Sequence, residues 1–201
     1  MEDSLPYSQA SENNKLPILD VMGRHLTGCH SLLELAGGTG QHAVFFAEQF
    51  PHLHWQSSDV PDAVATLNLR LTHAGLSNLP IGIPIDVNSP AWNCGVVDAI
   101  YSANSLHIMS AASVEHFFTG VERHLSKAGL LLVYGPFKYN GEFTTESNAK
   151  FDLWLKERNP VSGVRDFEWV NALAEAVGMS LVEDNAMPAN NQMLVWKMRS
   201  H

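Results

Sequence analysis

A glycine-rich turn and two aspartates are the residues of this sequence best suited to bind a nucleotide. The segment 34–41 reads Glu-Leu-Ala-Gly-Gly-Thr-Gly-Gln after an apolar run, so the chain can turn sharply and a ligand can approach its backbone. Asp59 comes 19 residues after Gly40 and ends the next strand-like run, where a carboxylate can accept hydrogen bonds from both hydroxyls of a ribose. Asp86, followed by Val87, ends a third run and can reach an adenine amino group. Each aspartate alone is explained as well by a helix cap or a solvated loop, but the three segments together indicate an adenosine-type ligand.

Polar residues also follow the fourth and fifth strand-like runs. His107 is a candidate general base, or a group that orients an acceptor hydroxyl, because an unperturbed imidazole has a pKa near neutrality. The alternative is a packing histidine that bonds a loop carbonyl. Tyr134 ends the fifth run and is the second candidate catalytic residue, and Asn104 follows the fourth run at the same end of the predicted sheet. Arg165 either belongs to the start of a helix or reaches the crevice to bind a carboxylate substrate.

Alternating strands and helices must position these residues. Apolar runs and turn signals predict strands at 31–36, 54–59, 81–87, 96–103, 129–134, 180–187 and 192–198. Helices are expected near 41–50, 60–71, 114–125, 147–157 and 166–177, after a first helix that has Pro17 in its first turn. This alternation predicts an α/β fold: a Rossmann-like, doubly wound, mainly parallel sheet that ends in an antiparallel C-terminal hairpin.

Length and composition set the broad class. The 201 residues suit one domain over 1–201, and 45% hydrophobic residues exclude a disordered chain. Residues 1–14 are polar and form either a lid over the site or a frayed terminus. The net charge of −9 disfavours nucleic acid and anionic lipid as partners, and two cysteines indicate free thiols in the cytoplasm. We expect no secretory signal, no membrane span and no metal site, because no acid or cysteine completes a ligand set with His52 and His54.

The glycine turn resembles motif I of class I S-adenosylmethionine (SAM)-dependent methyltransferases, with Ala36 where most members have glycine. Most of the chain is similar to the DUF938 (UPF0585) family of methyltransferase-like proteins. The stretches that carry this resemblance are 14–19 (Asn-Lys-Leu-Pro-Ile-Leu), 38–43 (Gly-Thr-Gly-Gln-His-Ala), 103–108 (Ala-Asn-Ser-Leu-His-Ile), 134–137 (Tyr-Gly-Pro-Phe), 163–166 (Gly-Val-Arg-Asp) and 187–191 (Met-Pro-Ala-Asn-Asn). The resemblance implies a seven-stranded SAM-binding fold but no particular substrate.

These observations lead to one expected function and two alternatives. We expect a SAM-dependent methyltransferase that acts on a small or medium molecule, with a small-molecule methyl acceptor as its partner. The alternatives are a non-catalytic protein that senses SAM or S-adenosylhomocysteine (SAH), and an NAD(P)-dependent oxidoreductase. The last is less favoured because the turn matches G-x-G-x-x-G only if Ala43 replaces the third glycine. The expected cofactor contacts are Glu34, Gly38, Gly40, Asp59, Asp86, Val87 and Asn104.

Overall fold

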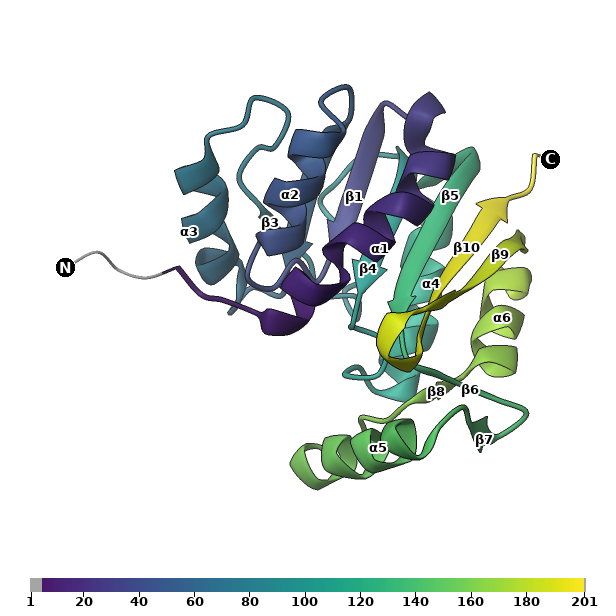
Figure 1. Ribbon diagram of the computed structural model, residues 1–201. Coiled ribbons are helices and arrows are strands. Elements are labelled where there is room, and N and C mark those ends of the chain that lie inside the picture. Colours follow the sequence, from purple (N-terminus) through teal and green to yellow (C-terminus); the bar gives the residue numbers. More distant parts are fainter. Residues whose placement is uncertain (1–4, 201) are drawn as a thin grey trace.

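A seven-stranded sheet forms the centre of the computed structural model, which describes residues 5–200 (Figure 1). Its strands are β1 (Ser31–Leu35), β2 (His54–Asp59), β3 (Ile83–Pro84), β4 (Val97–Ala103), β5 (Leu125–Gly135), β9 (Met179–Met187) and β10 (Asn191–Met198). They lie in the order β3-β2-β1-β4-β5-β10-β9. The first five pair in parallel, whereas β10 runs antiparallel to both β5 and β9. This arrangement confirms the predicted doubly wound sheet and its antiparallel C-terminal hairpin.

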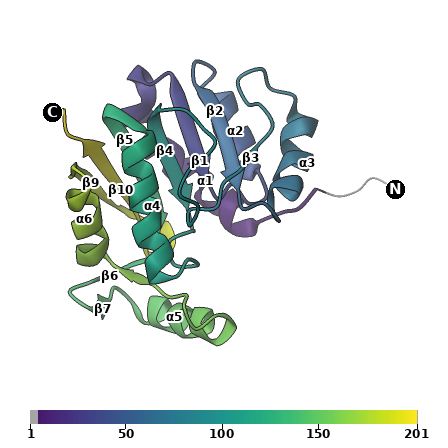
Figure 2. The ribbon, with the colours of Figure 1, turned by 180° about the vertical axis from the view of Figure 1, so that it is seen from behind.

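Helices cover both faces of the sheet. One face carries α1 (Gln9–His25), α2 (Gln41–Gln49) and α3 (Val64–Ala74), and the other carries α4 (Ala111–His124) and α6 (Phe167–Ala176), as the reverse view in Figure 2 shows. Successive strand residues alternate between these layers: Leu32 packs with the first set of helices and Leu33 with the second. Both faces are therefore buried, which explains why the central strands are mainly apolar.

The segment between β5 and α6 builds a small extension beyond the ends of the strands (Figure 1). It contains β6 (Phe137–Tyr139), β7 (Glu142–Phe143), α5 (Glu146–Arg158) and β8 (Arg165–Asp166). The three short strands form a second sheet in the order β7-β6-β8. The sequence predicted only a polar loop over residues 135–145, because strands of two or three residues leave no periodic pattern.

The first helix starts earlier than predicted. It begins at Gln9, so Pro17 lies inside it rather than in its first turn. Ser8 caps the helix because its Oγ accepts a hydrogen bond from the Ser11 amide at 3.2 Å. Residues 9–14 of the predicted polar arm are therefore helical, and residues 1–4 lie outside the described part of the chain. Proline costs the helix one hydrogen bond, and burial of Ile18 and Met22 on the following turn offsets that cost.

The third strand is much shorter than the predicted 81–87. It consists of Ile83 and Pro84 only, because proline has no amide hydrogen to extend the ladder, and after one further bond, from the Ile85 amide to the Asp59 carbonyl, the chain turns at residues 87–88. In that turn Asp86 Oδ1 accepts hydrogen bonds from the amide and the side chain of Asn88, each at 2.9 Å. The chain thus leaves the sheet just before Asp86.

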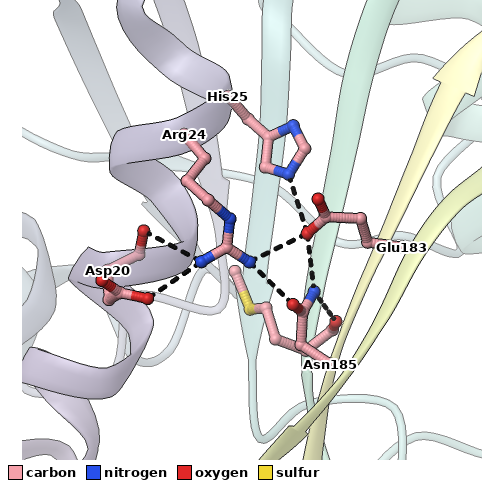
Figure 3. Close-up of polar contacts among 6 residues, drawn as sticks. Asp20, Arg24, His25, Glu183 and Asn185 are labelled. Atoms are coloured by element: carbon pink, nitrogen blue, oxygen red, sulfur yellow. Dashed lines mark hydrogen bonds and ion pairs between the residues drawn. The ribbon is translucent and has the colours of Figure 1, made fainter.

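A polar cluster joins α1 to the edge strand β9 (Figure 3). Arg24 donates hydrogen bonds to Glu183 Oε2 at 2.9 Å and to Asn185 Oδ1 at 2.7 Å, and it also pairs with Asp20. His25 Nε2 lies 3.1 Å from the same Glu183 oxygen. The hydrogen bond from Arg24 is the main reason that the pKa of Glu183 falls to about 2. The cluster fixes the position of α1 against β9. It contributes little to stability, because Arg24, Asp20 and Glu183 are at least partly exposed to solvent.

Two 3₁₀ turns complete the chain. One, η1 (Leu26–Gly28), follows α1, and the other, η2 (Pro188–Asn190), joins β9 to β10. Within η2, Ala189 and Asn190 both have a φ of 58°, in the left-handed region that residues other than glycine rarely adopt. The C-terminal hairpin therefore closes through a strained connection.

Candidate functional site

The glycine-rich turn after β1 is held in an unusual backbone conformation. Ala36, Gly38 and Gly40 have positive φ values of 60°, 57° and 74°. A Cβ at Gly37 would lie 2.4 Å from Ser57 Oγ, so only glycine fits there. A Cβ at Gly38 would meet no atom within 4 Å, which means that this part of the backbone faces open space. The turn therefore exposes its backbone in front of the N-terminus of α2, a suitable place for a ligand.

Asp59 fixes this turn. Its Oδ2 accepts a hydrogen bond from the Gly38 amide at 2.7 Å, and its Oδ1 accepts one from the Val60 amide at 2.7 Å. The residue is only 9% exposed. A carboxylate has about four acceptor positions, so one bond on each oxygen leaves room for further donors. Asp59 thus ties the end of β2 to the turn after β1 and keeps capacity for a ligand.

The carboxyl group of Glu34 is buried beside the same turn. Ser57 Oγ and Trp55 Nε1 donate to its Oε2 at 2.6 and 3.1 Å. Burial raises the pKa of Glu34 to about 7, although these two hydrogen bonds favour the charged form. Glu34 therefore exchanges its proton near neutral pH, where a cationic ligand group would favour the carboxylate.

Two cavities meet at Ala36, and most of the predicted cofactor residues lie around them. The central cavity, of about 440 Å³, is lined by Glu34, Gly38, His42, Asn104 and His107, among others. The lateral cavity, of about 190 Å³, is lined by Asp59, Asp86, Val87 and Met109, among others. Gly40 lines neither of these two cavities and instead packs against α3, where a Cβ would lie 3.2 Å from Leu67. The structure thus brings together six of the seven predicted residues, divided between adjacent cavities.

His107 lies at the far wall of the central cavity. It is 5% exposed, and Phe151 meets its ring edge to face with centroids 5.3 Å apart. Burial, together with the positive charge of Arg165, lowers the pKa of His107 to about 4. The imidazole is therefore neutral at pH 7, with a pKa well below the near-neutral value of an unperturbed histidine.

Tyr134 does not line the central cavity. It is 3% exposed and lines a neighbouring cavity of about 210 Å³ with Asn14 and Asn191. Burial raises the pKa of its hydroxyl, so that group stays protonated at neutral pH. Asn104 connects the two candidate catalytic residues because it lines both cavities, and its amide donates to the Tyr134 carbonyl at 2.8 Å.

His42 is a site residue that the sequence reasoning missed. Its Nε2 lies 2.7 Å from Asn14 Oδ1 and 3.2 Å from the Ser11 carbonyl, and its Nδ1 lies 3.1 Å from Tyr101 Oη. Two acceptors beside Nε2 assign the proton to that nitrogen, so the Tyr101 hydroxyl donates to Nδ1. Burial lowers the pKa of His42 to about 4. A neutral histidine thus links α1, α2 and β4 at the wall of the central cavity.

The segment before α1 is tied to the glycine turn. The Gln41 side chain bonds both the amide and the carbonyl of Ser8. Arg70 donates to the Pro6 carbonyl and, at 2.8 Å, to the Thr39 carbonyl. Ser8 itself lines the central cavity. Residues 6–8 therefore cross the turn next to the candidate site.

The guanidinium of Arg165 donates its hydrogen bonds to backbone carbonyls. It donates to Leu106 at 3.1 Å, to Val161 at 2.8 Å and also to Met109. These bonds hold the loop that carries His107, so Arg165 positions that loop. The interpretation of Arg165 as a binder of a substrate carboxylate is not supported by this arrangement.

The described residues contain no group of three or more metal-ligating side chains. Within residues 5–200, no helix is long and apolar enough to cross a membrane.

The strand order, the antiparallel β10 and the glycine turn after β1 define the class I methyltransferase fold, and solved structures of that class superpose well. An O-methyltransferase family protein from Burkholderia thailandensis has a TM-score of 0.82 at 16% identity, over 95% of this chain and 58% of that chain. Human N-acetylserotonin methyltransferase, solved in complex with SAM, has a TM-score of 0.79 at 14% identity, over 96% of this chain and 53% of that chain. This chain therefore spans little more than half the length of these proteins.

The chain belongs to the family described as "Protein of unknown function (DUF938)", whose model matches residues 5–198. This match confirms the resemblance found in the sequence.

Proposed function

We propose that the protein binds SAM and transfers its methyl group to a small or medium molecule. The observation that carries this proposal is the pair of cavities that meet at Ala36 beside the glycine turn. Asp59, Asp86 and Val87 in the lateral cavity would hold the adenosine. Glu34, Gly38 and Asn104 in the central cavity would hold the amino-acid end. The similarity of the fold to methyltransferases, one of them solved in complex with SAM, supports SAM as the cofactor.

Methyl transfer requires little chemistry from the protein itself. SAM supplies an activated methyl group on a sulfonium, so the residues need to align the acceptor and exclude water. Neutral His107 can accept a hydrogen bond from an acceptor hydroxyl or amine at the wall of the central cavity. His107 would thus orient the acceptor, and Tyr134, which stays protonated, would donate a hydrogen bond from the adjoining cavity.

Isothermal titration with SAM, SAH and NADH in separate experiments tests the cofactor. The proposal predicts micromolar binding of SAM and SAH and none of NADH. Binding of NADH alone would favour an oxidoreductase, and no binding of any of the three would contradict both functions. A later incubation with methyl-labelled SAM and fractionated metabolite extracts would then identify the acceptor.

A second candidate function is SAM or SAH sensing without catalysis. The observation that favours it is the lack of a strong base at the central cavity: both ring nitrogens of His42 are already hydrogen-bonded, and burial lowers the pKa of His107. Sensing predicts SAH binding without label transfer to any extract fraction. It also predicts that a cell that carries His107→Ala in place of the wild-type protein shows no change in phenotype. Transfer of label to any extract component would contradict it.

A further inference from the structure

A second group of cavities adjoins the central cavity and is lined by carboxamides. One, of about 210 Å³, lies beside Tyr134, and the other, of about 280 Å³, lies beside Phe151. Both are lined by Asn104, Ala189 and Asn191, so we treat them together as the asparagine cavity. Asn13, Asn14 and Asn148 also line it. No Asp, Glu, Lys, Arg or His is among the described residues that line either part.

Asn104 connects the asparagine cavity to the central cavity. It lines all three spaces and has a φ of 55°, in the left-handed region. Its backbone amide bonds the Tyr134 carbonyl, but within residues 5–200 its carboxamide has no hydrogen-bond partner. A polar side chain held in a strained backbone and left without a partner is available to a ligand.

Other carboxamides of the cavity hold its walls in place. Asn148 donates to Thr144 Oγ1 at 3.0 Å and to the Asn190 carbonyl at 2.9 Å, which joins α5 to the strained η2 turn. Asn14 is held by His42. The cavity is thus built, before any ligand enters, from parts of the chain that are distant in sequence: α1, the ends of β4 and β5, α5 and the β9–β10 connection.

The lining determines what the asparagine cavity can accept. A charged ligand group would lose its hydration and find no counter-charge among these residues, which is costly. Carboxamides donate and accept hydrogen bonds side by side, so they pair best with a group that does the same. Phe151, which Trp154 backs by ring stacking at 5.6 Å, offers a planar wall.

We infer that the asparagine cavity recognises an uncharged, planar methyl acceptor through an amide-type edge, such as a carboxamide or a lactam. This inference rests on the proposed function, because it assigns the central cavity to SAM. The acceptor would place its amide-type edge among the asparagines and its reactive atom toward Asn104, where the cavities join.

Three probes of nearly equal shape and different charge test the inference. Benzamide is neutral, benzoate is an anion and benzamidine is a cation at neutral pH. Ligand-observed NMR titrations on the full chain, with SAH present, should give benzamide a dissociation constant at least about tenfold below those of the other two. Equal binding of all three, a preference for a charged probe, or no binding of benzamide would each overturn the inference.

An introduced charge should reverse the selectivity. Asn191→Asp places a carboxylate in the cavity, so benzamidine should become the best ligand, and Asn93→Asp, at an exposed position elsewhere, should change nothing. Asn13→Asp on the cavity rim is a second variant that keeps the test available if Asn191→Asp does not fold. Unchanged selectivity in a folded Asn191→Asp or Asn13→Asp protein would contradict the assignment.

Titration of the same samples with SAH separates this inference from the proposed function. SAH binding without a preference for benzamide would refute the acceptor assignment alone. A preference for benzamide without SAH binding would refute the cofactor assignment and leave the asparagine cavity as a binding site for neutral amides.

Discussion

Glu34 shows how a single buried carboxyl group can connect stability to ligand binding. Burial raises its pKa to about 7 from an ordinary value of 4.5. Between pH 4.5 and about 7, the folded protein therefore keeps a proton on Glu34 that the unfolded chain has released. The contribution of Glu34 to stability is present below about pH 4.5 and is lost as the pH rises to about 7.

Glu34→Gln should remove this dependence. Between pH 5 and 7, the free energy of unfolding of the variant should rise with pH more steeply than that of the wild type, by about 1.4 kcal/mol per pH unit. Urea unfolding at a series of pH values measures both slopes. Glu12→Gln, at a helix position on the surface, is the control, and parallel curves for Glu34→Gln and the wild type would contradict the assignment.

Asp59 belongs both to the fold and to the proposed cofactor site. Asp59→Asn removes the charge and turns one acceptor oxygen into a donor that would face the Gly38 or Val60 amide. We expect SAH binding to weaken by about 1–3 kcal/mol, which corresponds to roughly 5- to 150-fold in the dissociation constant. Isothermal titration measures the change, and exposed Asp62 provides the control Asp62→Asn. An unchanged SAH affinity would refute a role of Asp59 in binding the ribose.

The sequence predicted some of these residues and missed others for identifiable reasons. Asp59 could be found because it ends a strand at a fixed distance from a glycine turn. His42 could not, because its spacing on α2 resembles that of a core residue and its partners lie on distant elements. Asn13 and Asn14 looked like a polar arm until the structure placed them on α1.

At the scale of the elements, short connections carry the strain that shapes the site. Ala36 and Ala189 are alanines with positive φ, a conformation that costs about 1–2 kcal/mol for a residue with a Cβ. Ala36 lies between the central and lateral cavities, and Ala189 lines the asparagine cavity. Both positions thus lie at the candidate site, whereas a third alanine with positive φ, Ala128 (61°), lies within β5 and lines none of the cavities described above.

Ala189→Gly should therefore stabilise the protein. Glycine removes the strain but increases the entropy of the unfolded chain, so the expected net gain is about 0.5–1 kcal/mol. Urea unfolding measures it. The matched control is Ala172→Gly in the exposed part of α6, which should destabilise the protein by about 0.5–1 kcal/mol. A loss of stability in Ala189→Gly would show that the turn is not strained.

Arg165 holds the loop between β4 and α4 through three backbone carbonyls. Arg165→Met should lower the free energy of unfolding by about 1–3 kcal/mol, because these carbonyls lose a charged donor. The ¹H–¹³C signals of the His107 ring should also move, because the loop loses its support. Arg158→Met, on the exposed face of α5, loses only a stacking contact with the Trp154 ring and should cost no more than about 1 kcal/mol. An unshifted His107 signal would refute the positioning role.

Element prediction succeeded where a pattern was long and failed where it was short. The buried strands β1, β4 and β5 stood out as apolar runs, and α4 stood out by its helical periodicity. The small sheet of β6, β7 and β8 had no such pattern, and the start of α1 was hidden by Pro17. In each failure a contact between distant residues, such as the bonds of Gln41 to Ser8 or the pairing of Phe137 with Arg165, helps to decide the structure.

At the scale of the whole molecule, buried titratable groups that line the central cavity determine the response to acid. His42 and His107 both have pKa values of about 4, below the ordinary 6.5, so folding requires them to be neutral. Their contribution to stability is complete above about pH 6.5 and is lost as the pH falls toward 4. Glu34 acts in the opposite direction over much of the same range.

The net result is a prediction for the wild-type protein. Between pH 5 and 6, unfolding lets His42 and His107 each take up a proton and lets Glu34 release one, so the net uptake is about one proton. The free energy of unfolding should therefore fall by about 1 kcal/mol for each pH unit of acidification. Urea unfolding at pH 5, 6 and 8 measures this slope. The double variant His42→Gln, His107→Gln should reverse its sign. A flat profile in the wild type would contradict the burial of these rings in neutral form.

The position of β10 between β5 and β9 has a consequence for how the chain acquires its structure during synthesis. β9 is made first, but its neighbour in the seven-stranded sheet is β10, so it has no place in that sheet until residues 191–198 have left the ribosome. Until then the β5 edge stays open, and unpaired edges favour association between chains. Completion of the sheet is thus a late event, in which β10 pairs with β5 on one side and β9 on the other. The same event brings the strained turn before β10 up to α1 and α5.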